Sequence, residues 1–216
     1  MTNDTNRLFI AMAGNIGAGK TTAAKLISRE FGFELFDEPV IDNPFLKDYY
    51  ADMKRWSFTL QLEFLMRRVE HHELIRTVPK SSIQDRTLYE DPEIFAKYLH
   101  GLGNMDDREL ELYFEYFNRL NNELRHPDLI LMLEVDHIST LLQRIQTRGR
   151  KEESGIDASF LSGLNAYYST FPQVCQKKYG IPIHVVNVEK LDIRSPEGQK
   201  VFFSEIENAM KANGIS

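Results

Sequence analysis

The chain has 216 residues, of which 42% are hydrophobic, and carries a formal net charge of −6. This length supports one well-buried core and is short for two, so we expect a single domain over residues 1–216. The acidic charge excludes a general nucleic-acid-binding protein, which would present a basic face. No apolar stretch has membrane-spanning length, residues 1–7 lack the apolar core of a signal peptide, and Cys175 is the only cysteine. We therefore expect a cytoplasmic protein that binds neither nucleic acid nor membranes.

Short apolar runs alternate along the chain with longer segments of helical periodicity. The expected strands are 8–13, 33–36, 82–84, 129–133 and 184–188. The expected helices are 21–31, 52–76, about 93–99, one from Asp106 to just before Pro127, one from His137, one from about Asp157 and one at the C-terminus. Glu109 follows Asp106 at the spacing of a capping box. The alternation predicts an α/β fold, a doubly wound parallel sheet of about five strands with helices on both faces. Ligands of such sheets bind at the carboxyl ends of the strands.

Residues 14–21, Gly-Asn-Ile-Gly-Ala-Gly-Lys-Thr, match the motif G-x-x-x-x-G-K-[ST] in full. The motif follows a predicted strand and opens a predicted helix, which is the context that a P-loop requires. Lys20 can then reach the β- and γ-phosphates of ATP, and the hydroxyl of Thr21 can bind Mg²⁺. The backbone N–H groups that would converge on the phosphates belong to Gly14, Asn15, Ile16, Gly17, Ala18 and Gly19. A glycine-rich turn with a chance lysine is the alternative, and the flanking strand and helix argue against it.

Charged residues follow two further predicted strands. Glu38 could accept the proton of an acceptor hydroxyl during phosphoryl transfer. Asp85 could hold Mg²⁺ directly or through water, and Arg86 could pair with Glu38 or with the transferred phosphate. Each residue alone is compatible with a solvated loop or a surface ion pair. Because the carboxyl ends of parallel strands share one edge of the sheet, we favour a common site.

Asp136 follows the strand 129–133 and resembles the acid that ends a Walker-B strand. Asp136 also precedes a predicted helix, and Asp is a preferred N-cap residue. We interpret Asp136 as a helix cap.

Three arginines, Arg144, Arg148 and Arg150, lie close together around Gly149. Basic residues at the end of a helix can simply compensate its dipole. The cluster extends beyond the glycine, however, and stands out in an acidic protein. We therefore favour a mobile lid that closes over phosphates and stabilises their charge.

The long helix 52–76 carries two polar residues, Gln61 and Arg68, seven positions apart on one face. Both can form paired hydrogen bonds with the edge of a nucleobase, although a solvated polar stripe is the commoner explanation. His71 and His72 adjoin on the same helix. Neighbouring helical residues point in different directions, so we expect surface histidines and no metal pair.

In this combination the sequence resembles the deoxynucleoside kinase family, most closely its bacterial deoxyadenosine/deoxyguanosine kinase branch. The resemblance extends from residue 9 to about residue 192. The motifs that carry it are residues 14–21, Glu38-Pro39, 55–61 (Arg-Trp-Ser-Phe-Thr-Leu-Gln), 85–87 (Asp-Arg-Thr) and 148–153 (Arg-Gly-Arg-Lys-Glu-Glu). Many relatives have Glu-Arg-Ser where this chain has Asp-Arg-Thr, and the shorter Asp85 would then contact magnesium through water.

The resemblance implies a P-loop kinase fold with an arginine lid, and ATP-dependent phosphorylation of the 5′-hydroxyl of a deoxynucleoside in nucleotide salvage. Deoxyadenosine or deoxyguanosine is favoured, with deoxycytidine as a further substrate, and a homodimer is expected. Catalytic roles fall to Glu38 as the base, Arg86 and Arg148. The remaining implied assignments are Gln61, Arg68 and Asp91 for the nucleobase, Tyr50 and Glu153 for the sugar 3′-hydroxyl, Asp85 for magnesium, Arg144, Arg148 and Arg150 for the lid, and the loop at Asp192 for the adenine of ATP.

Two other functions use the same P-loop. A nucleoside monophosphate kinase would share the loop and lid but would need extra positive charge for the phosphate of its acceptor. A nucleotide-dependent switch protein would hydrolyse slowly and signal by shape, and an acceptor site with Glu38 argues against it.

Overall fold

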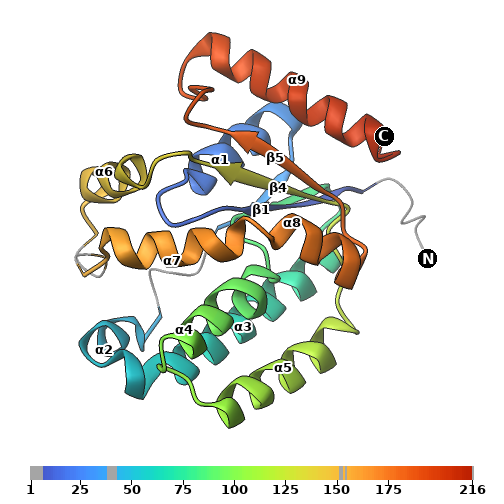
Figure 1. Cartoon of the computed structure of the whole chain (residues 1–216). Helices are drawn as coiled ribbons and strands as arrows, with labels where there is room; N and C mark the ends of the chain where they lie inside the picture. Colours follow the sequence, from blue (N-terminus) through green and yellow to red (C-terminus); the bar gives the residue numbers. More distant parts are fainter. Residues whose placement is uncertain (1–6, 38–42, 151–152, 154, 216) are drawn as a thin grey trace.

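The computed structural model describes residues 7–37, 43–150, 153 and 155–215. At its centre lies a sheet of five strands in the order β2-β3-β1-β4-β5, and all neighbouring strands are parallel. Helices cover both faces (Figure 1), so the predicted doubly wound sheet is confirmed. The strands are β1 (Phe9–Ala13), β2 (Glu34–Phe36), β3 (Ser82–Gln84), β4 (Leu129–Glu134) and β5 (Ile183–Asn187).

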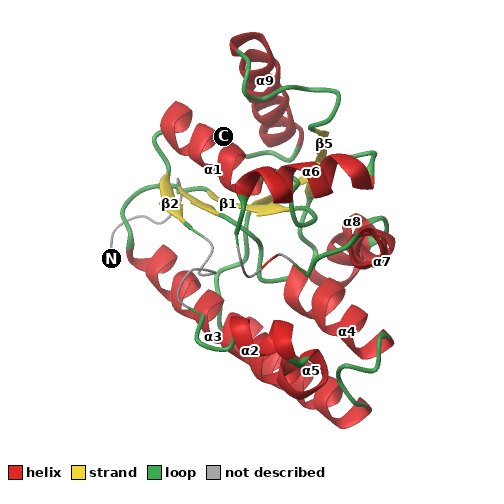
Figure 2. Ribbon diagram, turned by 90° about the vertical axis from the view of Figure 1, so that its left-hand side faces the viewer, coloured by secondary structure: helices red, strands yellow, loops and turns green. Residues whose placement is uncertain are grey.

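The helices form one layer on each side of the sheet, seen from a second direction in Figure 2. The layer with α1, α6 and α9 packs on one hydrophobic core, and the layer with α3, η1, α5 and α7 packs on the other. The helical elements are α1 (Lys20–Phe31), α2 (Leu46–Ala51), α3 (Met53–Thr77), the π-helix η1 (Asp91–Ala96), α4 (Lys97–Gly101), α5 (Asp107–Asn121), α6 (Ile138–Arg148), α7 (Ala158–Tyr168), α8 (Phe171–Val174), the π-helix η3 (Cys175–Tyr179) and α9 (Pro196–Ala212).

The central strand β1 shows why its sequence is apolar throughout. Successive side chains of a strand point to opposite faces of the sheet. Phe9 and Ala11 accordingly belong to the core under α3 and α5, whereas Ile10 and Met12 belong to the core under α1 and α9. A strand that is buried on both faces cannot alternate with polar residues, so it reads as a continuous apolar run.

Several helix boundaries follow from caps that the sequence shows. The side chain of Asp52 accepts a hydrogen bond from the backbone N–H of Arg55 and begins α3. Asp106 and Glu109 form the predicted capping box of α5, with both hydrogen bonds at 2.9 Å. That helix ends at Asn121, earlier than the predicted end before Pro127. The short elements α2, α8 and η3 were not predicted, because four to six residues are too few to show a helical period.

The predicted cap at Asp136 is wrong. His137 occupies the N-cap position of α6 and makes no side-chain capping bond. Asp136 instead accepts a hydrogen bond from the side chain of Asn187 at 2.6 Å and pairs with Lys190 at 3.1 Å. The carboxylate therefore joins the ends of β4 and β5, a tertiary contact that replaces the local one.

His72 also differs from its prediction as a surface residue. Its side chain is buried, with Nδ1 3.0 Å from the carbonyl oxygen of Arg125 and the ring edge-on to Phe9. Burial lowers the pKa of His72 to about 4, so the imidazole is neutral at physiological pH. Among the helices of the described residues, none has the length and apolar character that crossing a bilayer needs.

Candidate active site

A cleft of about 870 Å³ lies at the carboxyl edge of the sheet, where the fold predicts a ligand. Most of the residues singled out from the sequence line it. They are Ile16, Gly17, Ala18, Gly19, Lys20, Thr21, Tyr50, Gln61, Arg68, Arg86, Asp91, Arg144, Arg148, Arg150, Glu153 and Asp192. Gly14, Asn15 and Asp85 are buried beside it. Glu38 lies outside the described residues.

The walls of the cleft come from two parts of the sequence. Residues 43–95 supply Tyr50, Gln61, Arg68, Arg86 and Asp91 together with aromatic and aliphatic neighbours. The P-loop and residues 144–194 supply the other set. The first stretch thus contributes the buried side chains of Gln61, Arg68 and Asp91, and the second contributes most of the basic side chains of the cleft.

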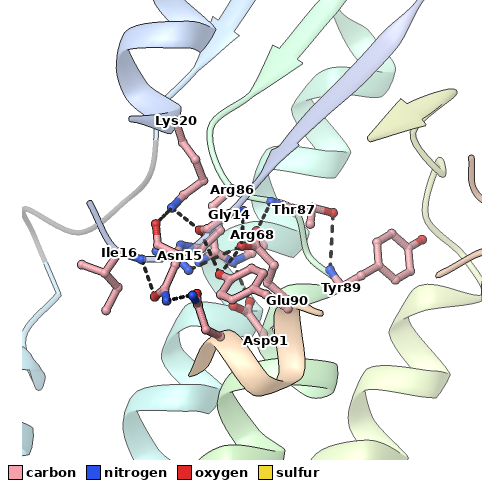
Figure 3. Close-up of polar contacts among 12 residues, drawn as sticks. Gly14, Asn15, Ile16, Lys20, Arg68, Arg86, Thr87, Tyr89, Glu90 and Asp91 are labelled. Carbon is pink, nitrogen blue, oxygen red and sulfur yellow. Dashed lines mark hydrogen bonds and ion pairs between the residues drawn. The ribbon is translucent and has the colours of Figure 1, made fainter. Parts of the chain in front are cut away.

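The P-loop depends on glycine at two positions where the chain passes other backbone closely. Gly14 has φ +139°, and a Cβ atom there would lie 2.6 Å from the carbonyl oxygen of Leu133. Gly17 has φ +84°, and its Cβ would lie 2.8 Å from the carbonyl oxygen of Leu141. L-residues rarely adopt such angles. Lys20 extends over the loop and donates to the carbonyl oxygens of Gly14 at 2.6 Å and Asn15 at 3.1 Å (Figure 3).

Thr21 and Asp85 meet at the start of α1. The Thr21 hydroxyl donates to Asp85 Oδ2 at 2.5 Å, and Asp85 is buried. A hydroxyl and a carboxylate are hard oxygen ligands, which fit Mg²⁺ in a site where substrate phosphates and water complete the coordination. In the described part of the chain no group of three or more His, Cys, Asp and Glu side chains could hold a metal.

Gln61, Arg68 and Asp91 form a buried polar group in the cleft. The Arg68 guanidinium donates to Asp91 Oδ2 at 2.5 Å, and both side chains are almost fully buried. Desolvation raises the pKa of Asp91 to about 6, although the charge and hydrogen bond of Arg68 act in the opposite direction. The Oε1 atom of Gln61 is buried and has no hydrogen-bond partner among the described residues. An acceptor buried without a partner is costly, so this atom is suited to a ligand donor.

Arg86 has a left-handed backbone, with φ +76°. Its guanidinium lies 4.7 Å from the centroid of the Phe95 ring and 3.8 Å from Glu90 Oε1. Strained non-glycine conformations are often found at functional sites, where surrounding structure maintains them.

The three predicted lid arginines divide into two groups. Arg148 donates three hydrogen bonds to the carboxylate of Glu153, at 2.6, 2.7 and 3.1 Å, and Arg150 lies 3.4 Å from the same group. Arg144 instead donates to the carbonyl oxygens of Ala18 and Val188, each at 3.1 Å. Arg144 therefore joins the P-loop to the segment after β5. In that segment Asp192 is exposed and accepts from Arg194 Nε at 2.9 Å.

Glu90 is a site residue that the sequence analysis did not identify. Its carboxylate is completely buried and accepts hydrogen bonds from the backbone N–H groups of Gly14 and Thr87, each at 3.0 Å (Figure 3). The available signal was the pair Glu90-Asp91 between apolar residues, just after the Asp-Arg-Thr motif. Acidic residues at the start of a helix are common because they interact favourably with the helix dipole. The pair therefore gave no reason to expect a buried carboxylate.

The comparisons with known proteins agree with this geometry. Residues 10–211 match the family described as deoxynucleoside kinase. The sequence is 38% identical to deoxyadenosine kinase of Dictyostelium discoideum over 179 residues, which cover 82% of this chain and 71% of the relative. It is 34% identical to deoxyadenosine/deoxycytidine kinase of Bacillus subtilis, over 76% of each chain. The solved structure of deoxyadenosine kinase from M. mycoides with bound dATP superposes with a TM-score of 0.81 at 33% identity, covering 93% of this chain and all of that one, 100%. The chain belongs to the deoxynucleoside kinase family.

Proposed function

We propose that this deoxynucleoside kinase transfers the γ-phosphate of ATP to the 5′-hydroxyl of a purine deoxynucleoside, deoxyadenosine or deoxyguanosine, in cytoplasmic nucleotide salvage. The observation that carries the proposal is the buried group of Gln61, Arg68 and Asp91 in the same cleft as the P-loop. Relatives named deoxyadenosine kinase and deoxyguanosine kinase support the purine preference. Family membership favours a nucleoside acceptor over the monophosphate of a nucleoside monophosphate kinase, and catalysis over a nucleotide switch.

Base selection follows from the chemistry of Asp91. A carboxylate accepts a hydrogen bond from an exocyclic amine, which adenine and cytosine carry and thymine lacks. Arg68 can donate to a purine ring nitrogen or to guanine O6, and the buried Oε1 of Gln61 can accept from a base N–H. Thymine carries the acceptor O4 at that position, which would face the Asp91 carboxylate without a hydrogen bond. An unpaired buried polar group costs about 1–3 kcal/mol, which corresponds to a roughly tenfold to hundredfold preference against thymidine.

The phosphate end follows P-loop chemistry. Lys20 and the backbone N–H groups of the loop would bind the ATP phosphates, and Thr21 and Asp85 would hold Mg²⁺. When bound, Mg²⁺ neutralises charge on the phosphates. Glu38 would take the 5′-hydroxyl proton, and Arg86 and Arg148 would stabilise the charge of the transferred group.

Sugar binding would involve Tyr50 and Glu153. Glu153 is also the partner of Arg148 and Arg150. A sugar hydroxyl that bonds to Glu153 would therefore help to place the arginines of the proposed lid, and Arg144 and Asp192 would lie near the adenine of ATP. Recognition of the acceptor and closure over the phosphates would then be coupled.

The chain would act as a single domain, residues 1–216, in a homodimer. Large apolar side chains are exposed on two neighbouring helices, Met66 and Leu74 on α3 and Leu112 and Tyr116 on α5. Such exposed apolar residues are typical of an interface. Light scattering of the purified protein at twice the monomer mass would support the dimer, and a monomer would contradict it.

The deciding experiment supplies purified protein with ATP–Mg and each of the four deoxynucleosides, with deoxyadenosine and deoxyguanosine monophosphates as further acceptors. We expect the highest kcat/KM with deoxyadenosine or deoxyguanosine and the lowest with thymidine. Asp91→Ala should reduce the difference in kcat/KM between the preferred purine deoxynucleoside and thymidine, chiefly by lowering kcat/KM for the preferred substrate. Efficient phosphorylation of thymidine by the unmutated enzyme would contradict the role of Asp91. Transfer to monophosphates alone would contradict the nucleoside acceptor.

A further inference from the structure

Glu90 connects three separate segments of the active site (Figure 3). Its Oε1 atom accepts from the backbone N–H of Gly14, at the start of the P-loop, and its Oε2 atom accepts from the backbone N–H of Thr87. The hydroxyl of Tyr168, at the end of α7, lies 2.6 Å from Oε1 and 2.9 Å from the carbonyl oxygen of Gly14. One carboxylate and one phenol thus fix the two sides of the cleft relative to each other.

The two backbone segments that Glu90 joins have different proposed roles in the reaction. Gly14 opens the loop that binds the donor phosphates, whereas Thr87 directly follows Asp85 and Arg86 on the acceptor and metal side. Thr87 is also bonded through its N–H to the carbonyl oxygen of Met12, at 2.7 Å. Charge-assisted hydrogen bonds to a carboxylate are about twice as strong as neutral ones, so Glu90 adds a second, stronger type of contact to the backbone bond between Thr87 and Met12.

A purely stabilising role does not account for this acid. A buried charge contributes little net stability, since its desolvation offsets the gain from its partners. A negative charge beside a phosphate-binding loop also opposes the binding of anionic phosphates. The Arg86 guanidinium, 3.8 Å from Oε1, offsets part of this charge. The carboxylate can accept from both backbone segments at once, which a neutral amide cannot.

We propose that Glu90 and Tyr168 are a positioning pair that sets the P-loop against the Asp85–Thr87 segment, and so aligns the donor phosphate with the acceptor hydroxyl. The inference rests on the proposed function for the location of donor and acceptor. Neither side chain touches the donor phosphate or the acceptor hydroxyl in this scheme, and Glu90 also helps to place the guanidinium of Arg86. Their contribution is alignment, and a displacement of about 1 Å at a reacting centre costs up to about a hundredfold in rate.

The test uses the full chain with Glu90→Gln, Tyr168→Phe and the double variant. The glutamine oxygen can still accept from Gly14 and Tyr168, but its NH₂ group then faces the N–H of Thr87. That variant removes the contact between Glu90 and Thr87 and leaves the Thr87 N–H bonded, among the described residues, to Met12 alone. We expect kcat to fall about tenfold to a hundredfold in Glu90→Gln, with both KM values within about threefold. Tyr168→Phe should lower kcat by a smaller factor. The double variant should lose about as much as Glu90→Gln alone, because the two residues act as one unit.

Tyr167→Phe is the matched control, because its hydroxyl sits on the same helix and, among the described residues, donates to the carbonyl oxygen of Lys97, at 3.4 Å, and not to Glu90 or Gly14. It should keep the kcat of the wild type. Unchanged kcat in Tyr168→Phe and Glu90→Gln would overturn the proposal, as would a loss that appears in KM for ATP alone or that matches a lower folded fraction. If Glu90→Gln does not fold, Tyr168→Phe decides by the same kcat and KM criteria. Failure of the wild type to phosphorylate any deoxynucleoside would refute the proposed function instead.

Discussion

Asp91 and Glu93 are buried carboxylic acids two positions apart on η1, and their pKa values move in opposite directions. Desolvation raises the pKa of Asp91 to about 6, in spite of Arg68. Desolvation also acts on Glu93, but hydrogen bonds from Lys178, Lys97 and Tyr179 outweigh it and lower its pKa. The two acids should therefore change the stability of the fold with opposite dependence on pH.

The change Asp91→Asn tests the first shift. Between the ordinary pKa of 3.8 and the folded value of about 6, the native state holds a proton that the unfolded chain releases. The stability that Asp91 contributes is fully present below the ordinary pKa of 3.8. It is lost as pH rises through the folded pKa of about 6. About two pKa units at about 1.4 kcal/mol each give a loss of about 3 kcal/mol. Asparagine does not titrate. The free energy of unfolding of the variant should therefore rise by about 3 kcal/mol relative to that of the wild type between about pH 4 and pH 7.

Urea unfolding of both proteins at several pH values measures the difference directly. Glu93→Gln is the internal control. A lowered carboxyl pKa contributes stability at higher pH that is lost on acidification, so this variant should lose stability relative to wild type as pH rises. A constant difference for Asp91→Asn would show that Arg68 cancels the effect of burial, and a difference that moves with the sign of Glu93→Gln would show that Arg68 outweighs it. Either result would refute the reasoning.

Three further changes test the catalytic assignments. Glu38→Gln should lower kcat by about 10²–10⁴ with little change in nucleoside affinity, since it removes only basicity; near-normal turnover would remove Glu38 from the mechanism. Arg148→Ala should depress kcat more than ATP affinity, with partial rescue by lysine, which lacks the planar fork; loss of ATP binding alone would make Arg148 a ground-state anchor. Asp85→Asn should raise the Mg²⁺ concentration needed for half-maximal activity, and an unchanged magnesium titration would exclude Asp85 as a ligand.

Local sequence patterns predicted most of the fold. The helices from Asp52 and Asp106 begin where their capping residues stand, because a cap is a contact between residues only three positions apart. The same local reasoning failed at Asp136. Its partners Asn187 and Lys190 come from a distant part of the chain, and their bonds replaced the expected cap.

The site was predicted where a motif or a resemblance named its residues. Gln61, Arg68 and Asp91 do meet in the cleft, although α3 and η1 are separated in sequence. Glu90 was missed because its role depends on hydrogen bonds from two backbone N–H groups, and one of these groups is 76 positions away. Burial of His72 was missed for a similar reason, since its Nδ1 atom lies 3.0 Å from the backbone carbonyl oxygen of Arg125, 53 positions away. Contacts with backbone atoms leave no side-chain pattern to detect.

The division of the cleft between two stretches of the chain has a consequence for how such enzymes diversify. Residues 43–95 carry the proposed base-binding group and also Asp85 and Arg86, so a change in the choice of base within this stretch has to keep those two residues while the P-loop stays unaltered. A gene segment exchanged at those limits between relatives of different substrate preference should carry the preference with it. The exchanged segment would then also have to preserve the hydrogen bond between the backbone N–H of Gly14 and the carboxylate at position 90.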